Sequence, residues 1–247
     1  MESSALCPIC CSAAQERLTP PRRRHLPSGD IVRCTSCYFV YRTARSCPWP
    51  PDSGEAVIPS AKAQPAPDEQ LARQLAIIEQ SVGCGAVLDI GCGDGSFLDR
   101  ACRHGWQVAG VGTHAAVQAH PLLHDASIQP SLQEGDWPAG SFDAVTIWDG
   151  FERSTHPENL LRLAAYYCRL DGVLALQIRH ADRRRTREEF TAMPDAEMPS
   201  CLYSPVAVHR LFSRYGFRTQ RITPVNLTSD MPLHREHRMI AVARYTP

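Results

Sequence analysis

The chain has 247 residues, of which 43% are hydrophobic and 21% charged, and this predicts a packed core for one α/β domain with a small appendage. Because 26 basic residues balance 26 acidic ones, the net charge gives no global attraction to nucleic acid or to anionic membrane surfaces. No apolar run approaches the roughly 20 residues of a membrane span, and the first residues show no signal-peptide pattern, so we expect no membrane association and a cytoplasmic location.

Two Cys-x-x-Cys pairs lie near the N-terminus, Cys7 with Cys10 and Cys34 with Cys37. A tight Cys-x-x-Cys turn directs two thiolates at one metal ion, and two such turns complete a tetrahedral sulfur site. We therefore predict a structural Zn²⁺, which would supply much of the folding free energy of so small a segment. Four thiolates leave no coordination position open for water, so the site should not be catalytic.

Other residues near these pairs are alternative ligands. Cys11 directly follows Cys10 and could replace it, although Cys-x-x-x-Cys fits the tight turn less well; His25 and Cys47 are further alternatives. A redox dithiol of the thioredoxin type would need a βαβ context, which is missing here. We interpret residues 1–47 as a zinc-ribbon-like module. Most other cysteines are scattered singly through the chain, as expected in a reducing compartment.

A linker and a helix are predicted next. Residues 48–67 are rich in Pro, Ala and Ser, which is typical of a linker. A second domain, residues 68–247, begins at Asp68, the expected N-cap of an amphipathic helix. The helix is indicated by apolar residues spaced by four, three and four positions, namely Leu71, Leu75, Ile78 and Val82.

A glycine-rich stretch follows this helix. The apolar run 87–90 leads into a loop with glycines at alternate positions, Gly91, Gly93 and Gly95, and a helix is predicted after it. Glycine has no Cβ, so the backbone can turn sharply and let a ligand approach closely at the carboxyl end of a parallel strand. The acid Asp89 before the first glycine, and the glycine spacing, distinguish this loop from a dinucleotide-binding fingerprint.

The stretch, with Asp-x-Gly-x-Gly at Asp89, Gly91 and Gly93, resembles motif I of the class I S-adenosylmethionine (SAM) dependent methyltransferases. The resemblance implies an α/β fold, a Rossmann-like seven-stranded methyltransferase sheet with helices on both faces. It also implies SAM as the cofactor, with these residues and Cys92 in its site. Zinc-ribbon-like modules similar to residues 1–47 precede many bacterial methyltransferase domains of this kind.

The strand predicted at 107–111 ends in a departure from the family pattern. The family carries an acid after this strand that binds both ribose hydroxyls, and Gly112 stands at that position. A carboxylate accepting two hydroxyl protons makes charge-assisted hydrogen bonds, and its loss would cost on the order of 2–3 kcal/mol of cofactor binding. Gly112 and Thr113 are expected beside the ribose, where Thr113 or His114 would compensate in part.

The later strands complete the expected cofactor site. By resemblance, Asp136 and Trp137 follow the third strand and should contact the adenine. A second match to the family is Ser-Phe-Asp-x-Val at 141–145, and Trp148 at the carboxyl end of this strand should face the ligand. A helix beginning at Pro157 is expected to end near 170–172, before a buried strand at 173–178. Two late strands, at 217 onward and 238–243, match the antiparallel hairpin that closes this fold.

A catalytic residue is less well defined. Where the family often has Glu-His after the fourth strand, this chain has Glu152-Arg153. His156 and His180 are candidate bases, provided that a partner positions them. A base is required only for an acidic O–H or C–H, because SAM is intrinsically reactive and the protein mainly aligns nucleophile, methyl group and sulfur. The catalytic residue therefore stays open.

The resemblance implies SAM-dependent methyl transfer to a small-molecule O-, N- or C-nucleophile. Gly112, the missing Glu-His pair and a reduced Pro-Gly-Gly turn at Gly172 favour an alternative, a catalytically degenerate methyltransferase-like protein that acts as a binding or assembly partner, so a protein partner is kept open. A second alternative is an RNA methyltransferase. We do not expect a nucleic-acid substrate. Residues 1–50 carry seven arginines and three acids, and four thiolates with Zn²⁺ add about minus two, so the remaining charge of about plus two is too small for a phosphate-binding surface.

Overall fold

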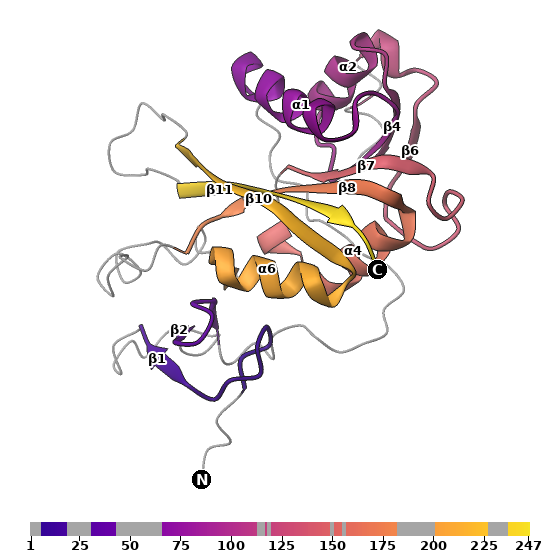
Figure 1. The fold of residues 1–247 in the computed structure, drawn as a ribbon. Coiled ribbons are helices and arrows are strands. Elements are labelled where there is room, and N and C mark those ends of the chain that lie inside the picture. Colours follow the sequence, from indigo (N-terminus) through magenta and orange to yellow (C-terminus); the bar gives the residue numbers. More distant parts are fainter. Residues whose placement is uncertain are drawn as a thin grey trace.

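A computed structural model of the chain describes residues 6–18, 31–42, 66–112, 117, 120–148, 151–154, 157–181, 201–226 and 237–247. The strands form one sheet of seven and one sheet of four. The larger sheet lies at the centre of the molecule, with α1 and α2 over one face and α4 and α6 over the other (Figure 1). Within the described ranges, no helix is long and apolar enough to cross a membrane.

The larger sheet has the order β10-β11-β8-β7-β4-β5-β6. Its strands, in chain order, are β4 (Ala86–Ile90), β5 (Gln107–Val111), β6 (Ser127–Gln129), β7 (Phe142–Ile147), β8 (Cys168–Arg179), β10 (Phe217–Asn226) and β11 (His237–Tyr245). The five neighbouring strands β8, β7, β4, β5 and β6 are parallel, whereas β11 is antiparallel to both β8 and β10. This arrangement confirms the seven-stranded sheet and the closing hairpin predicted from the sequence.

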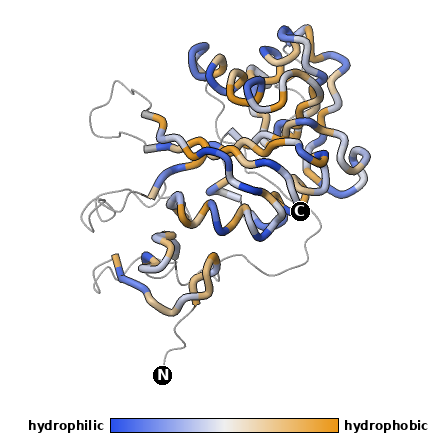
Figure 2. Tube along the Cα trace, in the orientation of Figure 1, coloured by the Kyte–Doolittle hydropathy of each residue, from blue (hydrophilic) through white to orange (hydrophobic). Residues whose placement is uncertain are grey.

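The helices are α1 (Asp68–Val82), α2 (Ser96–Arg103), α4 (Pro157–Tyr167) and α6 (Pro205–Arg214), with short 3-10 helices η1 (Pro121–Leu123) and η2 (Phe151–Arg153). Helix α1 buries Leu71, Leu75 and Ile78 as the apolar spacing predicted, but its N-cap is Pro67, so Asp68 is the first helical residue. Hydrophobic residues gather along the central strands, while hydrophilic residues alternate with them on the helices (Figure 2). Helix packing here follows from the apolar stripes.

One predicted boundary is wrong. Helix α4 ends at Tyr167, and β8 begins at once with Cys168, so the turn expected near 170–172 lies inside a strand. Cys168 pairs with Phe142 at the start of β7, and the register then shifts before Ala144. Asp171 absorbs this irregularity with a φ of 61°. The residues 169–172 have no partner in this register, and only Asp143 lies between the two paired positions of β7, so the turn persists as a bulge within β8.

The four-stranded sheet joins the N-terminal module to a strand from much later in the chain. Its strands are β1 (Gln15–Arg17), β2 (Ile31–Cys34), β3 (Val40–Arg42) and β9 (Cys201–Leu202), in the order β1-β2-β3-β9. Strand β9 lies far along the chain, yet Val40 pairs with Leu202 and Tyr41 with Cys201. The apolar core is also shared, because Phe39 packs on Tyr203 with ring centroids 4.9 Å apart. The N-terminal module is thus packed against the large domain, below α6 in Figure 1.

Candidate functional site

The four cysteines of the two Cys-x-x-Cys pairs converge. The sulfur atoms of Cys7, Cys10, Cys34 and Cys37 all lie within 4.8 Å of one another. The Sγ atoms of Cys7 and Cys37 are 3.6 Å apart, and those of Cys10 and Cys34 are 3.5 Å apart. A tetrahedral Zn²⁺ with Zn–S distances of about 2.3 Å places its sulfur ligands about 3.8 Å apart. The donor set and its spacing therefore fit a zinc ion.

The two pairs are held by the same backbone turn. The N–H of Cys11 donates to the carbonyl of Cys7 at 2.7 Å, and the N–H of Tyr38 donates to the carbonyl of Cys34 at 2.8 Å. Both donors follow the second cysteine of their pair and have positive φ values, 56° and 60°. Cys11 is exposed and lies outside the converging group, whereas Cys10 belongs to it. His25 and Cys47 lie outside the described residues.

The clustered thiols share protons. The hydrogen bond with Cys37 lowers the pKa of Cys7 to about 5, and the same contact raises the pKa of Cys37. Burial raises the pKa of Cys10. Cys7 is therefore favoured as a thiolate at neutral pH. A divalent cation among the four sulfur atoms would stabilise all four cysteines as thiolates.

The glycine loop begins where β4 ends. Gly91, Gly93 and Gly95 have φ values of 84°, 58° and 84°, which explains why glycine occupies each position. The N–H groups of Gly91 and Cys92 donate to the carbonyl of Val111 at 2.8 and 3.0 Å, so the loop is fastened to the end of β5. A Cβ placed on Gly93 would meet no atom within 4 Å. The loop thus leaves open space where a ligand can approach its backbone.

Asp89 is buried beneath this loop, with 3% of its surface exposed. The hydroxyl of Thr146 on the neighbouring strand β7 donates to Asp89 Oδ1 at 2.7 Å. Burial raises the pKa of Asp89 to about 7, while the hydrogen bond from Thr146 acts in the opposite direction. A cationic ligand group nearby would therefore favour the ionised carboxylate.

Cys92 fills the space beside Gly112. A Cβ on Gly112 would lie 2.8 Å from Cys92 Sγ, closer than an ordinary contact. Burial raises the pKa of the Cys92 thiol to about 12, so the side chain is a neutral apolar group. The N–H of Gly112 donates to the carbonyl of Gln129 at 2.8 Å, which fixes the ends of β5 and β6 side by side. Both residues lie at the expected cofactor edge.

Trp148 also lies at this edge, one residue beyond β7. Its ring packs edge-to-face on Phe97, with ring centroids 5.2 Å apart. Phe97 is the second residue of α2 and closely follows the glycine loop. The structure therefore places Trp148 close to the helix that follows the loop.

Asp136 and Trp137 lie elsewhere. Trp137 packs edge-to-face on Phe142, the first residue of β7, and its indole N–H donates to Ser127 at 3.1 Å. The Asp136 carboxylate accepts a hydrogen bond from the N–H of Gln133 at 2.8 Å and so closes a turn. Because a six-residue strand is roughly 17 Å long, this aromatic group lies near the opposite end of β7 from the glycine loop. The structure does not bring Asp136 and Trp137 together with that loop.

Of the remaining candidates, His180 alone lies in the part of the chain that the structure describes. Thr113 and His156 lie outside the described residues. His180 directly follows β8 and forms an isolated β-bridge with Tyr203. Close by in the chain, Arg179 Nε lies 3.6 Å from the buried carboxylate of Glu152. The structure supplies no geometry that selects a catalytic base among these residues.

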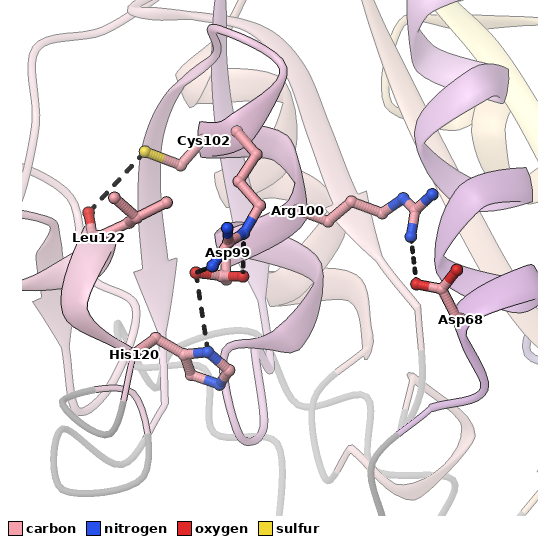
Figure 3. A network of polar contacts seen from close by, with 7 residues as sticks. Asp68, Asp99, Arg100, Cys102, His120 and Leu122 are labelled. Carbon is pink, nitrogen blue, oxygen red and sulfur yellow. Dashed lines mark hydrogen bonds and ion pairs between the residues drawn. The ribbon is translucent and has the colours of Figure 1, made fainter.

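A polar network fastens the helices around the site (Figure 3). Arg100 of α2 pairs with Asp68, the first residue of α1. Asp99, on the same helix, points the other way, toward His120 Nδ1 at 3.8 Å. His120 immediately precedes η1, so this contact ties the start of η1 to α2. Such exposed pairs contribute little stability, and we assign them a positioning role.

Two glutamines that the sequence analysis did not single out meet between α1 and β8. Gln74 interrupts the apolar face of α1, and Gln177 interrupts the apolar run of β8. Both are buried, and Gln74 Nε2 donates to Gln177 Oε1 at 3.5 Å. A polar residue within each apolar pattern was the signal that could have revealed them.

A family model described as a methyltransferase domain matches residues 61–222. A search of curated proteins finds no match. One similar solved structure is the Burkholderia thailandensis 1,6-didemethyltoxoflavin-N1-methyltransferase with bound 1,6-didemethyltoxoflavin and S-adenosylhomocysteine, with 18% identity, coverage of 80% of this chain and 98% of that chain, and a TM-score of 0.55.

Two further structures share the fold. One is a complex between the Haloferax volcanii Trm112 methyltransferase activator and a methyltransferase, with 18% identity, coverage of 71% and 88%, and a TM-score of 0.56. The other is the [4+2]-cyclase SpnF, with 14% identity, coverage of 79% and 88%, and a TM-score of 0.58. At these identities the likeness shows the fold alone.

Proposed function

This chain belongs to the class I SAM-dependent methyltransferase family, and we propose that it transfers a methyl group from SAM to a small-molecule acceptor through an O-, N- or C-nucleophile. The observation that carries the proposal is the glycine loop, because Gly93 leaves open space at the carboxyl end of β4 directly above the buried Asp89. When bound, SAM supplies an activated methyl group. Trp148 and Asp89 belong to the same edge of the sheet, where ligands of such sheets bind.

The residues of the chain would align and desolvate the reactants. The backbone of Gly91 and Gly93 would approach the cofactor closely, and Asp89 would face its cationic end. Trp148 and Phe97 would exclude water from the region between β7 and α2. Such alignment is sufficient for methyl transfer to a nucleophile that is already deprotonated. We therefore assign no general base.

A small-molecule acceptor is supported by charge and by analogy. The formal net charge of zero offers no broad attraction to a polyanion. The Burkholderia thailandensis structure holds 1,6-didemethyltoxoflavin, a small molecule, on a similar fold. The analogy sets the expectation for the class of acceptor and leaves its identity to experiment.

Calorimetric titration with SAM and S-adenosylhomocysteine tests the proposal. We expect saturable binding by the full chain, and a large loss of affinity in Gly93→Ala, whose methyl group would enter the open space of the loop. Gly135→Ala is the matched control, because Gly135 also has a positive φ, 96°, and open space around its Cβ position, but lies outside the loop. No binding at millimolar cofactor would remove the enzymatic proposal.

A second candidate, a catalytically degenerate methyltransferase-like partner protein, is favoured by Gly112. This position carries no carboxylate, and Cys92 Sγ lies where a side chain would begin. Failure of the titration above, together with co-purification of a defined protein, would support this candidate. An enzyme with weakened cofactor affinity would instead bind S-adenosylhomocysteine at higher concentrations.

We also propose a structural Zn²⁺ at Cys7, Cys10, Cys34 and Cys37. Its support is the spacing of the four sulfur atoms and the matching turns of the two pairs. The purified protein should contain one zinc per chain by elemental mass spectrometry, and Cys10→Ser should lose it. Cys11→Ser is the matched control and should retain the metal, because Cys11 is exposed and outside the group. Loss of zinc in both variants, or in neither, would contradict this assignment.

The module would fix α6 at both ends. Ser204, the N-cap of α6, donates to the carbonyl of Cys37 in one cysteine turn. Arg214, the last residue of α6, donates to the carbonyl of Ile9 in the other turn at 2.8 Å. We therefore treat residues 1–47 as a module that stabilises the domain 68–247, with 48–67 as the linker. None of the described cysteines takes part in a disulfide, and we propose a cytoplasmic location.

A further inference from the structure

Two buried hydrogen-bond donors belong to residues at the ends of neighbouring strands. They are the indole Nε1 of Trp148 and the amide Nε2 of Gln177, and neither has an acceptor in the ranges of the chain that the structure describes. The two residues expose only 7% and 1% of their surface. Buried donors in native proteins are nearly always paired, so each of these requires an explanation.

The register of the sheet places the two residues next to each other on adjacent strands. Ile147 of β7 pairs with Leu176 of the parallel strand β8, so the next residues, Trp148 and Gln177, stand beside each other on adjacent strands. Residues two positions earlier on the two strands are Thr146 and Ala175, and side chains at this spacing share one face. Ala175 belongs to the core cluster under α1, as does Trp148. Both donors therefore lie on the α1 face.

Gln74 of α1 fixes the amide of Gln177. Gln74 Nε2 donates to Gln177 Oε1 at 3.5 Å, so the oxygen of that amide is occupied and its N–H₂ group is left as the donor. An unpaired buried donor destabilises the folded chain. The folded chain would retain the unpaired donors of Trp148 and Gln177 if a ligand oxygen accepted hydrogen bonds from both.

The surrounding charges indicate what that oxygen belongs to. Asp89 lies on the same face, since Thr146, two residues before Trp148, donates to it. One residue of strand rises about 3.3 Å and adjacent strands are about 4.8 Å apart, so the carboxylate lies roughly 7 Å or more from the donors. An acid at one end and two N–H donors at the other match the ammonium and the carboxylate of an α-amino acid.

We propose that Trp148 and Gln177 bind the carboxylate of the methionine end of SAM, and that Gln74 is the positioning residue for Gln177. This inference rests on the proposed function, because it assumes that SAM occupies the glycine loop. It assigns a binding role to Gln177 and a positioning role to Gln74, and neither role is predicted by strand or helix periodicity. The contact of Trp148 with Phe97 places this subsite next to the loop.

Paired ligands with and without the amino-acid end test the inference. S-Adenosylhomocysteine carries the carboxylate, whereas 5′-methylthioadenosine has the same nucleoside without it. We expect Gln177→Leu and Trp148→Phe each to weaken S-adenosylhomocysteine about tenfold or more in calorimetry, which is the range for a hydrogen bond to a charged group. The affinity for 5′-methylthioadenosine should stay within about twofold.

Two controls separate binding from folding. Thermal unfolding of the unliganded double variant Gln74→Leu/Gln177→Leu should occur at or above the wild-type temperature, because the two substitutions together remove both buried amides and leave neither without its partner. Gln107→Leu, at the exposed start of β5, should leave both affinities unchanged. Equal losses for both ligands, or no loss for either, would overturn the inference while leaving the proposed function intact. Absence of binding by the wild-type chain would sink the proposed function and the inference with it.

Discussion

Replacing Gly112 with aspartate would place a carboxylate where the family binds the ribose hydroxyls. The φ of Gly112 is not in the left-handed region, so an L-residue can adopt this backbone. The obstacle is Cys92, whose Sγ would lie 2.8 Å from the new Cβ. The other near neighbours, the backbone nitrogens of Cys92 and Gly93, would lie 3.7 Å away, an ordinary contact distance.

The expected gain follows from two opposing contributions. A charge-assisted contact to the ribose is worth on the order of 2–3 kcal/mol. Moving the Cys92 side chain away from its preferred rotamer would cost about 0.5–1.5 kcal/mol. Gly112→Asp should therefore bind S-adenosylhomocysteine by about 1–2 kcal/mol more tightly, a gain of roughly five- to thirtyfold. Combining it with Cys92→Ala removes the obstructing sulfur, and the gain should reach roughly thirty- to a hundredfold.

Isothermal titration calorimetry of four proteins checks this reasoning: the wild type, Cys92→Ala, Gly112→Asp and the double variant. Gly112→Asn is the matched control, because asparagine has nearly the same shape without the charge and should recover only a small part of the gain. The reasoning would be refuted if the double variant bound S-adenosylhomocysteine no more tightly than Cys92→Ala. In that case Gly112 does not stand beside the ribose.

Three further predictions concern pH, the α6 contact and the aromatic group. Burial raises the pKa of Asp89 to about 7, so the contribution of protonated Asp89 to the free energy of unfolding should be fully present below about pH 4 and lost as the pH rises through 7. The affinity for SAM should rise between pH 6 and 8, because the carboxylate ionises over this range. Asp89→Asn should abolish that rise in calorimetry. Ser204→Ala should lower the free energy of unfolding by about 1–2 kcal/mol. Ser213→Ala, at an exposed site in the same helix, should change that free energy by less than about 0.5 kcal/mol. Trp137→Phe should cost about 0.5–1.5 kcal/mol in denaturant titration through its lost hydrogen bond and leave S-adenosylhomocysteine affinity unchanged; an affinity loss would place Trp137 at the cofactor after all.

Local sequence patterns predicted much of the fold. The apolar run before Gly91 and the Ser-Phe-Asp-x-Val stretch each specified a buried strand, and the structure confirms them as β4 and β7. The cysteine pairs also predicted their own convergence, because a Cys-x-x-Cys turn orients both thiols within a few residues. These features depend on neighbours in the chain, so a sequence can show them directly.

Residues between elements were harder to place. Asp136 matched the expected residue type, yet its carboxylate closes a turn near the start of β7. A connection that leaves the carboxyl end of β6 must travel back to the amino end of β7, and the sequence does not show where along that path each residue falls. The end of α4 was misplaced for a related reason, because the pairing of Cys168 with Phe142 decides where β8 begins.

The sequence by itself determined the glycine loop, the cysteine pairs and the alternation of strands and helices, since each depends on short-range spacing. Only the tertiary structure decided that β9 completes the sheet of the N-terminal module and that Gln74 meets Gln177, because those partners are separated by more than a hundred residues. It also decided that Cys92 fills the space beside Gly112. Such contacts depend on which strands become neighbours, and that choice is made by the packing of the whole core.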